Sequence, residues 1–346
     1  MASLAPVELL RRQYLQLLDP EKLTMPSAEL LRMPEIQAQM FDAMFKESGK
    51  MYLPPDRYRY RVLKRLVNAL EDAIEDPDED EISNDLSGAL ADYMVKTLPS
   101  SSEAAQQKSY ITYTTPSSDQ NAPQITLLES PSLLASSGTT GFRTWEAALF
   151  LGAYLSLPIG SDYVANRRII ELGAGTGFLS ILCAKHLGAS HVLATDGSQE
   201  VITDLQTNIE INALNKGDVI LTSVLQWGHS LFNGAADCRD SGLIYDLAIG
   251  ADVTYDIGSI PSLIATLRDL FDLYPKIQVL IPATVRNADT INNFTAACMQ
   301  NGFIIRKLET TLCQSALQMG FFISTMSPIH MFLITREESA KDPFGL

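Results

Sequence analysis

The feature that most constrains the fold of this chain is an alternation of short apolar runs with helical patterns that begins at Arg168. Apolar runs of strand length occur at 169–172, 191–195, 219–224, 246–249, 277–281, 303–308 and 331–335. Helical spacing of apolar residues separates several of them, at 179–187, 201–214 and 263–274. Strands that alternate with helices in this way form a mostly parallel sheet that is covered on both faces. The sequence therefore predicts a doubly wound α/β fold with a seven-stranded sheet.

The first part of the chain has a different character, because its apolar residues recur at helical spacing without strand-like runs. We therefore expect a helical N-terminal accessory region over residues 1–98. A polar segment rich in Ser, Gln and Ala, 99–109, is expected to be a linker. The α/β domain is then expected over 110–346, with short strands in 110–135 that lead into a core over 142–336.

A basic cluster with interleaved tyrosines runs from Arg57 to Arg65, and an acidic run follows at 76–81. One interpretation is a basic docking surface, for example for RNA. The other is a solvated helix face followed by a charged loop. Charge runs usually keep a surface soluble, so the second interpretation is favoured.

Composition narrows the classes of partner. The chain has 26 basic and 41 acidic residues, a formal net charge of −15, which argues against non-specific wrapping of nucleic acid. No apolar stretch approaches the roughly 20 residues that a membrane span needs, and the N-terminus has no signal or transit pattern. The four cysteines, Cys183, Cys238, Cys298 and Cys313, lack metal-ligand spacing, so neither a metal site nor a disulfide framework is expected. A cytoplasmic monomer is the expectation.

The segment from Glu171 to Gly177 joins a predicted strand to a predicted helix and has the pattern Glu-x-Gly-x-Gly-x-Gly. Its glycines, Gly173, Gly175 and Gly177, let the backbone turn sharply and approach a ligand closely. A dinucleotide loop would need glycine where Phe178 stands, and a phosphate-binding P-loop would need a lysine that this loop lacks. The remaining pattern resembles the S-adenosylmethionine loop of class I methyltransferases.

Two carboxylates accompany this loop. Asp196 ends the second predicted strand, where it can accept hydrogen bonds from both ribose hydroxyls of an adenosine ligand. Its alternative role is a helix N-cap before Gly197, and the two roles can coexist. Glu171 has a similar alternative, a loop carboxylate that satisfies backbone N–H groups; in the methyltransferase pattern it faces the cofactor.

Three further motifs follow in order along the chain: Gly-Phe-Arg-Thr-Trp-Glu-Ala-Ala at 141–148, Leu-Gln-Trp-Gly at 225–228 and Gly-Ala-Asp-Val-Thr-Tyr at 250–255. With the glycine loop, they resemble the seven-strand protein-lysine methyltransferase family over roughly residues 109–336. The helical region before residue 100 is most similar to the branch that acts on translation elongation factor 2. The resemblance implies S-adenosylmethionine as cofactor, a lysine side-chain amine of a protein as substrate, and elongation factor 2 as the partner.

The resemblance also implies the residues of the site. Those that would bind the cofactor are Trp145, Glu171, Gly173, Ala174, Gly175, Gly177, Asp196, Trp227 and Ala251. Trp145 and Trp227 are the only tryptophans in the chain, and their indoles offer rigid contact surfaces for adenine. The alternative is that both are core aromatics.

Asp252 and Tyr255 resemble the family's Asp-x-x-Tyr signature at the mouth of the substrate channel and would be the catalytic residues. Methyl transfer needs a neutral amine that is aligned with the methyl group, so positioning and desolvation are the main contributions of the enzyme. Asp252 would recruit the incoming ammonium group, and Tyr255 would hold it by cation–π contact and hydrogen bonding. The alternatives are a strand-end cap for Asp252 and a half-buried packing residue for Tyr255.

Two other functions stay open from the residues alone. One is a class I methyltransferase for RNA or a small molecule, although residues after position 100 include 14 basic and 23 acidic side chains. The Asn-Pro-Pro-aromatic motif of nucleic-acid amino methyltransferases is also absent after the fourth predicted strand. The other is a non-catalytic adaptor that binds S-adenosylmethionine or nothing, and the intact glycine loop speaks against its empty form.

Overall fold

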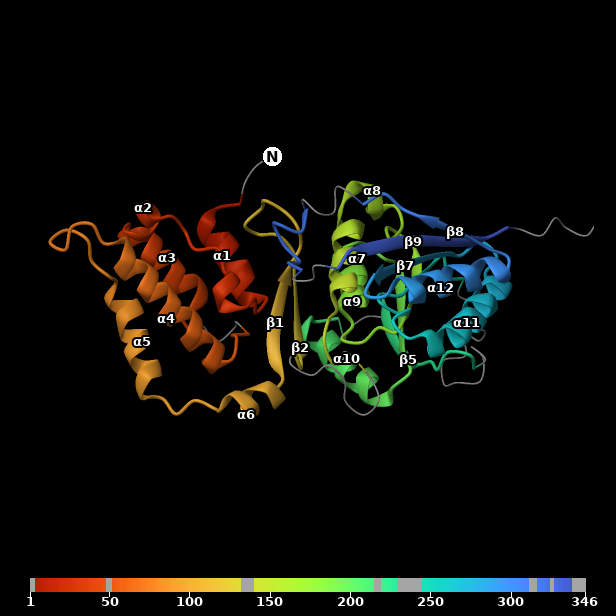
Figure 1. Ribbon diagram of the computed structural model, residues 1–346, viewed down its shortest axis with the longest axis horizontal. Coiled ribbons are helices and arrows are strands. Elements are labelled where there is room, and N and C mark those ends of the chain that lie inside the picture. The colour runs from red at the N-terminus through yellow and green to blue at the C-terminus, as the bar shows by residue number, and fades with distance from the viewer. Residues whose placement is uncertain are drawn as a thin grey trace, which may run out of the picture. The chain divides into compact units, whose positions relative to one another are not determined.

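A computed structural model of the chain describes residues 4–47, 52–131, 140–214, 219–229, 244–310, 316–323 and 327–337. Contacts divide the chain into two compact units. The first is Met1–Leu133 with Gln318–Phe322, and the second is Leu134–Leu317 with Ile323–Leu346. Figure 1 labels their α-helices and several of their strands.

The second unit contains a seven-stranded sheet in the order β5-β4-β3-β6-β7-β9-β8. Its strands are β3 (Arg168–Leu172), β4 (His191–Asp196), β5 (Ile220–Val224), β6 (Leu247–Ile249), β7 (Gln278–Thr284), β8 (Phe303–Lys307) and β9 (Ile329–Arg336). The first five strands of this order pair in parallel, whereas β9 pairs antiparallel with both β7 and β8. The predicted mostly parallel seven-stranded sheet is confirmed, and each strand lies on one of the predicted apolar runs.

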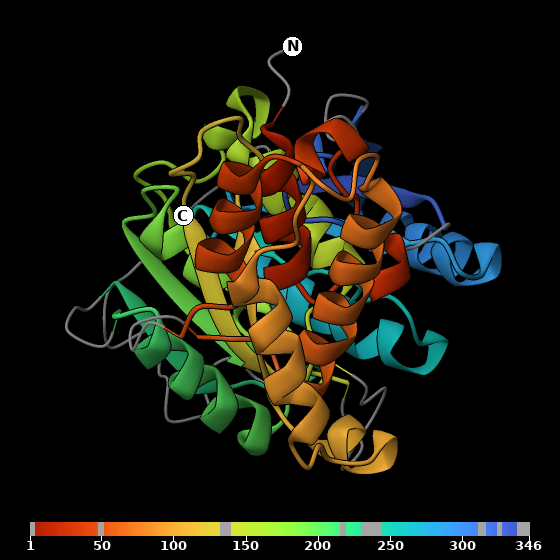
Figure 2. The same cartoon turned by 90° about the vertical axis from the view of Figure 1, so that its left-hand side faces the viewer.

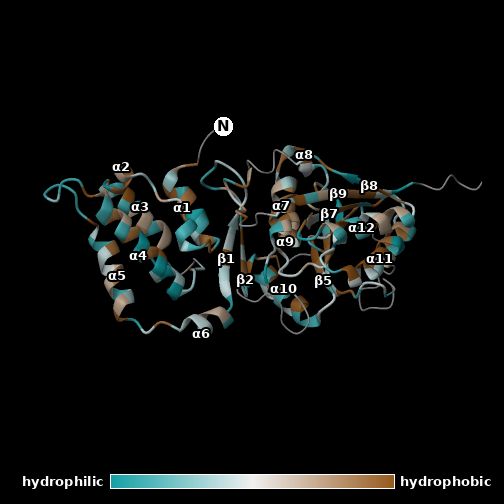
Figure 3. Ribbon diagram, viewed as in Figure 1, coloured by the Kyte–Doolittle hydropathy of each residue, from teal (hydrophilic) through white to brown (hydrophobic). Residues whose placement is uncertain are grey.

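Helices cover both faces of this sheet (Figure 1). They are α7 (Glu146–Ser156), α8 (Pro158–Ser161), α9 (Phe178–Lys185), α10 (Gln199–Ile211), α11 (Ile260–Leu273) and α12 (Ala288–Gln300), with the 3₁₀ turn η2 (Ile257–Ser259) before α11. Ile170 of β3 is buried in one apolar cluster with Leu267 of α11 and Phe294 of α12. The neighbouring Ile169 is also fully buried, and successive strand residues point to opposite faces. Burial on both faces explains why the inner strands β3, β6 and β7 are rich in apolar residues, which Figure 3 colours brown.

The first unit is mainly helical, as predicted for residues 1–98, and Figure 2 shows its helices from red to orange. Its elements are α1 (Pro6–Leu15), η1 (Pro20–Lys22), α2 (Ala28–Leu31), α3 (Pro34–Met44), α4 (Asp56–Ala73), α5 (Asn84–Val95), α6 (Ser101–Gln106), β1 (Ser109–Thr114) and β2 (Gln124–Glu129). Leu10, Met40 and Leu66 come from three different helices and are all fully buried in one cluster. The unit therefore has an apolar core of its own.

The polar segment 99–109, predicted as a linker, contains the helix α6. Ser100 and Glu103 form a reciprocal capping box, in which each side chain accepts a hydrogen bond from the other residue's backbone N–H. This arrangement satisfies N–H groups that the first turn of a helix leaves without partners. The segment is therefore ordered by local hydrogen bonds although it buries little apolar surface.

The contacts also place the boundary between the units after β2, whereas the sequence suggested it before β1. Arg12 of α1 is buried and donates hydrogen bonds to the carbonyl oxygens of Ser117, at 2.6 Å, and Met319, at 2.9 Å. Gln16 exchanges two hydrogen bonds with the backbone of Phe322. The β1–β2 loop and the distant segment 318–322 are therefore both held by side chains at the end of α1.

The basic cluster from Arg57 to Arg65 makes internal contacts within the first unit. Arg57 donates to the carbonyl of Pro99 at 3.1 Å, and buried Arg59 donates to the carbonyl of Phe45 at 3.1 Å. Arg65 donates to the carbonyl of Leu23 at 3.2 Å. Three of these arginines thus hold neighbouring backbone segments against α4. Neither the docking surface nor the solvated helix face that the sequence suggested included this structural role.

No helix within the described part of the chain is both long enough and apolar enough to cross a membrane.

Candidate functional site

A pocket of about 420 Å³ lies in the second unit, where the parallel strands of the sheet end. Its volume falls within the range of about 300–1,000 Å³ that is usual for small-molecule sites. It is lined by every predicted site residue except Gly177: Trp145, Glu171, Gly173, Ala174, Gly175, Asp196, Trp227, Ala251, Asp252 and Tyr255. The structure therefore brings together residues that the sequence spreads over more than 100 positions.

The glycine loop connects β3 to α9 and forms one wall of the pocket. Gly173 has φ +69°, in the left-handed region that favours glycine, and a Cβ there would lie 3.3 Å from Val253 Cγ1. Gly177 has φ +84° and is the residue before α9. A Cβ on Gly177 would lie 2.0 Å from Leu205 Cδ1 of α10. The packing of α9 against α10 therefore requires a residue without a side chain at this position. Its predicted contact with the cofactor stays a prediction.

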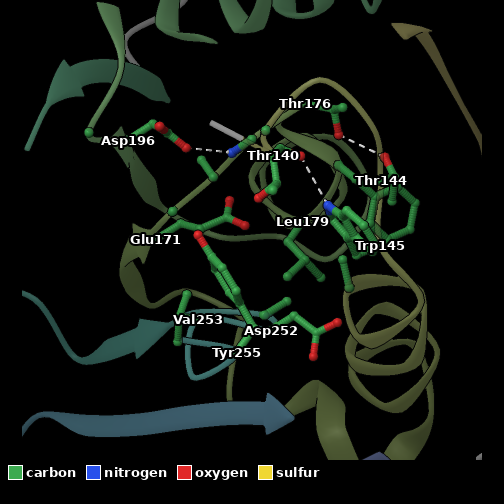
Figure 4. A pocket seen from close by; sticks show the side chains of 18 of the residues that line it. Thr140, Thr144, Trp145, Glu171, Thr176, Leu179, Asp196, Asp252, Val253 and Tyr255 are labelled. Atoms are coloured by element: carbon green, nitrogen blue, oxygen red, sulfur yellow. Dashed lines mark hydrogen bonds between the residues drawn. The ribbon is translucent and has the colours of Figure 1, made fainter. Parts of the chain in front are cut away.

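Asp196 is the last residue of β4 and connects this strand to the glycine loop. Its carboxylate accepts a hydrogen bond from the backbone N–H of Gly175 at 3.1 Å, which Figure 4 draws as a dashed line. It accepts a second one from the backbone N–H of Ser198, also at 3.1 Å. The N-cap of α10 is Ser198, whose hydroxyl accepts from the N–H of Val201, so Asp196 is not the cap. Burial raises the pKa of the Asp196 carboxyl above its ordinary value. Among the described residues, the donors to the Asp196 carboxylate at the pocket are thus neutral backbone N–H groups.

Glu171 lies within β3, one residue before the strand ends, and is 2% exposed. Its Oε2 accepts hydrogen bonds from the Ser180 backbone N–H, at 3.0 Å, and from the Ser180 hydroxyl. Burial raises the pKa of this carboxyl to about 8. Satisfying a backbone N–H was the alternative role of Glu171, and the structure shows that contact together with a position in the pocket wall.

The two tryptophans line the pocket and are only partly buried, and Trp227 also packs against the apolar core cluster of the sheet. Trp145 donates from Nε1 to the carbonyl of Thr140 at 3.0 Å. Its ring contacts two guanidinium groups, with Arg143 Cζ 4.4 Å and Arg286 Cζ 5.1 Å from the ring centroid. Both contacts are within the usual cation–π range of about 6 Å. Trp145 therefore holds two arginine side chains at the pocket.

Asp252 follows β6 and has φ +53°, a left-handed conformation that is uncommon for a residue other than glycine. Its carboxylate accepts hydrogen bonds from the Thr284 N–H at 2.8 Å, from the Thr284 hydroxyl at 3.0 Å and from Arg286 at 3.1 Å. These contacts tie the loop after β6 to the end of β7, as the alternative of a strand-end cap implied. Tyr255 is 58% exposed, so it is not a half-buried packing residue.

The sequence did not single out four residues that shape the site: Arg143, Ser180, Thr284 and Arg286. Arg143 lies inside the motif at 141–148 and could have been considered there. Arg286 follows the carboxyl end of a parallel strand, the position that pointed to Asp196, so the same rule could have found it. Ser180 offered no signal, because it looks like any polar residue of a helix.

Comparison with known proteins agrees with this geometry. A family model described as lysine methyltransferase matches residues 132–299. Protein-lysine N-methyltransferase EFM3 of Chaetomium thermophilum is 44% identical over 326 residues, which cover 94% of this chain and 96% of that protein. EFM3 of Saccharomyces cerevisiae is 30% identical over 62% of this chain and 66% of its own length. Protein-lysine N-methyltransferase EEF2KMT of Homo sapiens is 30% identical over 49% of this chain and 53% of its own length.

The similarity to the Chaetomium protein extends over nearly the whole of both chains, and the sheet and glycine loop are those expected of a class I methyltransferase. The chain therefore belongs to the S-adenosylmethionine-dependent protein-lysine N-methyltransferase family.

Proposed function

We propose that this enzyme methylates a lysine side chain of translation elongation factor 2 in the pocket beside the glycine loop. The observation that carries the proposal is the meeting of the glycine loop, Asp196, Asp252 and Tyr255 around one cavity. The similarity to EFM3 spans 94% of the chain, so it includes the helical first unit as well as the sheet. The human relative is named EEF2KMT, which supports elongation factor 2 as the substrate.

The residues of the pocket fit S-adenosylmethionine. Asp196 offers a carboxylate to ribose hydroxyls, and the backbone at Gly173 and Gly175 can approach a ligand without interference from Cβ atoms. Trp227 offers an apolar plane for adenine in the same pocket. Leu225, two residues before it, donates its N–H to the backbone carbonyl of Asp196 at 2.8 Å and so connects this segment to the end of β4. When bound, S-adenosylmethionine supplies an electrophilic methyl group on a positively charged sulfur.

The substrate side of the pocket has an exposed aromatic ring and a braced carboxylate. Tyr255 can hold an incoming ammonium group by cation–π contact and can direct its hydroxyl toward the amine. Asp252 is already hydrogen-bonded to Arg286, so we assign it to positioning the loop that carries Tyr255. This assignment replaces simple recruitment of the ammonium group by Asp252. The pocket walls then keep the amine in line and partly desolvated, which favours its neutral, reactive form.

We also propose that the enzyme works in the cytoplasm, where elongation factors act, as a monomer that does not take nucleic acid as its direct substrate. The formal net charge of −15 supports a basic protein surface as partner, because opposite charges raise encounter rates. Light scattering on the purified enzyme tests whether it is a monomer. Methylation rates that do not change with salt concentration would contradict the proposed attraction between the acidic enzyme and a basic protein surface.

The test incubates the pure enzyme with labelled S-adenosylmethionine and either purified elongation factor 2 or a cytosolic extract, with and without nuclease. We expect one protein band of the size of elongation factor 2 to take up label in every case, and mass spectrometry to place the methyl groups on a lysine. Label that disappears with nuclease, or that falls on small metabolites, would overturn the proposal. Label confined to another protein, such as elongation factor 1A, would overturn elongation factor 2 as the target.

A further inference from the structure

Glu171 is a carboxyl group that faces the pocket without a cation beside it. Figure 4 shows its side chain directed into the pocket, and only 2% of the residue is exposed. Its hydrogen-bond donors are the N–H and hydroxyl of Ser180, which are both neutral. Within the part of the chain that the structure describes, no lysine, arginine or histidine forms an ion pair with it. A buried charge in such a place is costly, because neutral donors compensate only part of the lost hydration.

The other ionisable groups around the pocket do not supply the missing positive charge. Asp196, at the end of β4, raises the pKa of Glu171 further, and the buried thiol of Cys183 on α9 is neutral because burial raises its own pKa. Asp252 and Tyr255, from the loop after β6, bring no positive charge.

The two cations of the pocket are engaged elsewhere. Arg143, before α7, is paired with Glu146 at 3.3 Å and contacts the ring of Trp145. Arg286, after β7, is paired with Asp252 at 3.1 Å. This arrangement, like burial that raises the pKa of the Glu171 carboxyl to about 8, favours its protonated form at neutral pH.

We propose that Glu171 holds a proton in the free enzyme and releases it when the positively charged cofactor binds, so that binding of S-adenosylmethionine liberates one proton. The inference rests on the proposed cofactor site. The O–H bond of the Glu171 carboxyl breaks, the proton passes to a base in the solvent, and the carboxylate stays opposite the positive charge of the cofactor. No electrons are exchanged.

This linkage gives the enzyme a means to distinguish its cofactor from the product. S-adenosylhomocysteine lacks the positive charge on sulfur, so it provides less compensation for an ionised Glu171 and releases less proton. Below pH 8, affinity for S-adenosylmethionine rises by up to about tenfold per pH unit, because the bound state carries one proton fewer. Affinity for S-adenosylhomocysteine rises less steeply, so the preference of the enzyme for the cofactor over the product increases as the pH rises towards 8.

The test is calorimetry of S-adenosylmethionine binding to the full-length enzyme at pH 7, in two buffers with different ionisation enthalpies. The buffer dependence of the heat gives the number of protons released. We expect nearly one proton for the wild type, less with S-adenosylhomocysteine, and close to none for Glu171→Gln. The amide keeps the shape of the side chain and cannot ionise. A wild-type heat that does not depend on buffer, or equal release from Glu171→Gln, would overturn the inference.

Ser180→Ala is the matched control, because it removes a donor to Glu171 but keeps the carboxyl group. Proton release should persist in this variant, and the pH at which affinity levels off should move upward. A second measurement needs no variant: infrared difference spectra should show loss of a protonated carboxyl band when S-adenosylmethionine is added to the wild type. Binding without that loss contradicts the inference alone, whereas absence of binding contradicts the proposed cofactor site itself.

Discussion

The pocket has two sides that treat their carboxylates in opposite ways. On the side that we propose for the cofactor, Glu171 and Asp196 accept hydrogen bonds from neutral donors, namely backbone N–H groups and the Ser180 hydroxyl. On the substrate side, Asp252 is already paired with a guanidinium, that of Arg286. The first arrangement leaves negative charge or protons available to respond to a ligand. The second uses its charge pair to fix the shape of a loop. We therefore propose that the two carboxylates with neutral donors bind the cofactor, whereas the carboxylate paired with a cation positions a loop.

The largest effect should follow from removal of Asp196. Asp196→Ala eliminates an acceptor for both ribose hydroxyls, and hydrogen bonds to a charged group contribute about 1.5–3 kcal/mol each. We expect cofactor affinity to fall by about 100-fold or more, measured by calorimetry. Glu200→Ala is the control, since Glu200 is an exposed carboxylate of α10 outside the pocket. Unchanged affinity in Asp196→Ala would place the cofactor elsewhere.

A change on the substrate side should affect turnover instead. Asp252→Asn keeps the size of the side chain but weakens its pairing with Arg286, so the loop that carries Tyr255 loses its fixed position. We expect kcat to fall about tenfold, equivalent to about 1.4 kcal/mol in the barrier, while cofactor affinity changes less than twofold. Arg286→Gln should give a similar loss, because it breaks the same pair. A large loss of cofactor affinity in Asp252→Asn would contradict the division into two sides.

A smaller loss of turnover should follow from Tyr255→Phe. The ring remains and can still hold a cation, so only the hydroxyl contact is lost, worth about 1 kcal/mol. We expect kcat to fall about fivefold and cofactor affinity to stay the same. Tyr255→Leu removes the ring as well and should be worse. Equal activity of Phe and Leu variants would show that the aromatic ring does not contact the substrate.

The smallest effect is expected from a change at Ser198, and it should show whether Ser198 contributes to cofactor binding together with Asp196. Ser198→Ala removes the N-cap of α10, which stabilises a helix by about 1 kcal/mol. Thermal unfolding should therefore begin a few degrees lower, and cofactor affinity at a temperature below unfolding should be unchanged. A strong loss of affinity in this variant would mean that the cap, and not the Asp196 carboxylate alone, supports the ribose site.

The sheet and the meeting of the glycine loop with Asp196 at one pocket were predictable because they depend on local patterns. Strands buried on both faces appear as apolar runs, and ligands of parallel sheets bind where strands end, which pointed to Asp196. The substrate side depends on a pair between Asp252 and Arg286, 34 positions apart, and no local pattern relates them. The helix α6 was readable from its Ser-x-x-Glu capping box, but polar composition suggested a linker instead.

The segment 318–322 gives the chain an unusual order of assembly. It lies between β8 and β9 in sequence, yet it belongs to the unit built mostly from the first 133 residues. Proteins fold from the N-terminus as they leave the ribosome. Until residues 318–322 are made, Arg12 lacks the Met319 carbonyl and Gln16 lacks the Phe322 backbone. The unit that is synthesised first is therefore completed only when all strands of the large sheet except β9 have already been made.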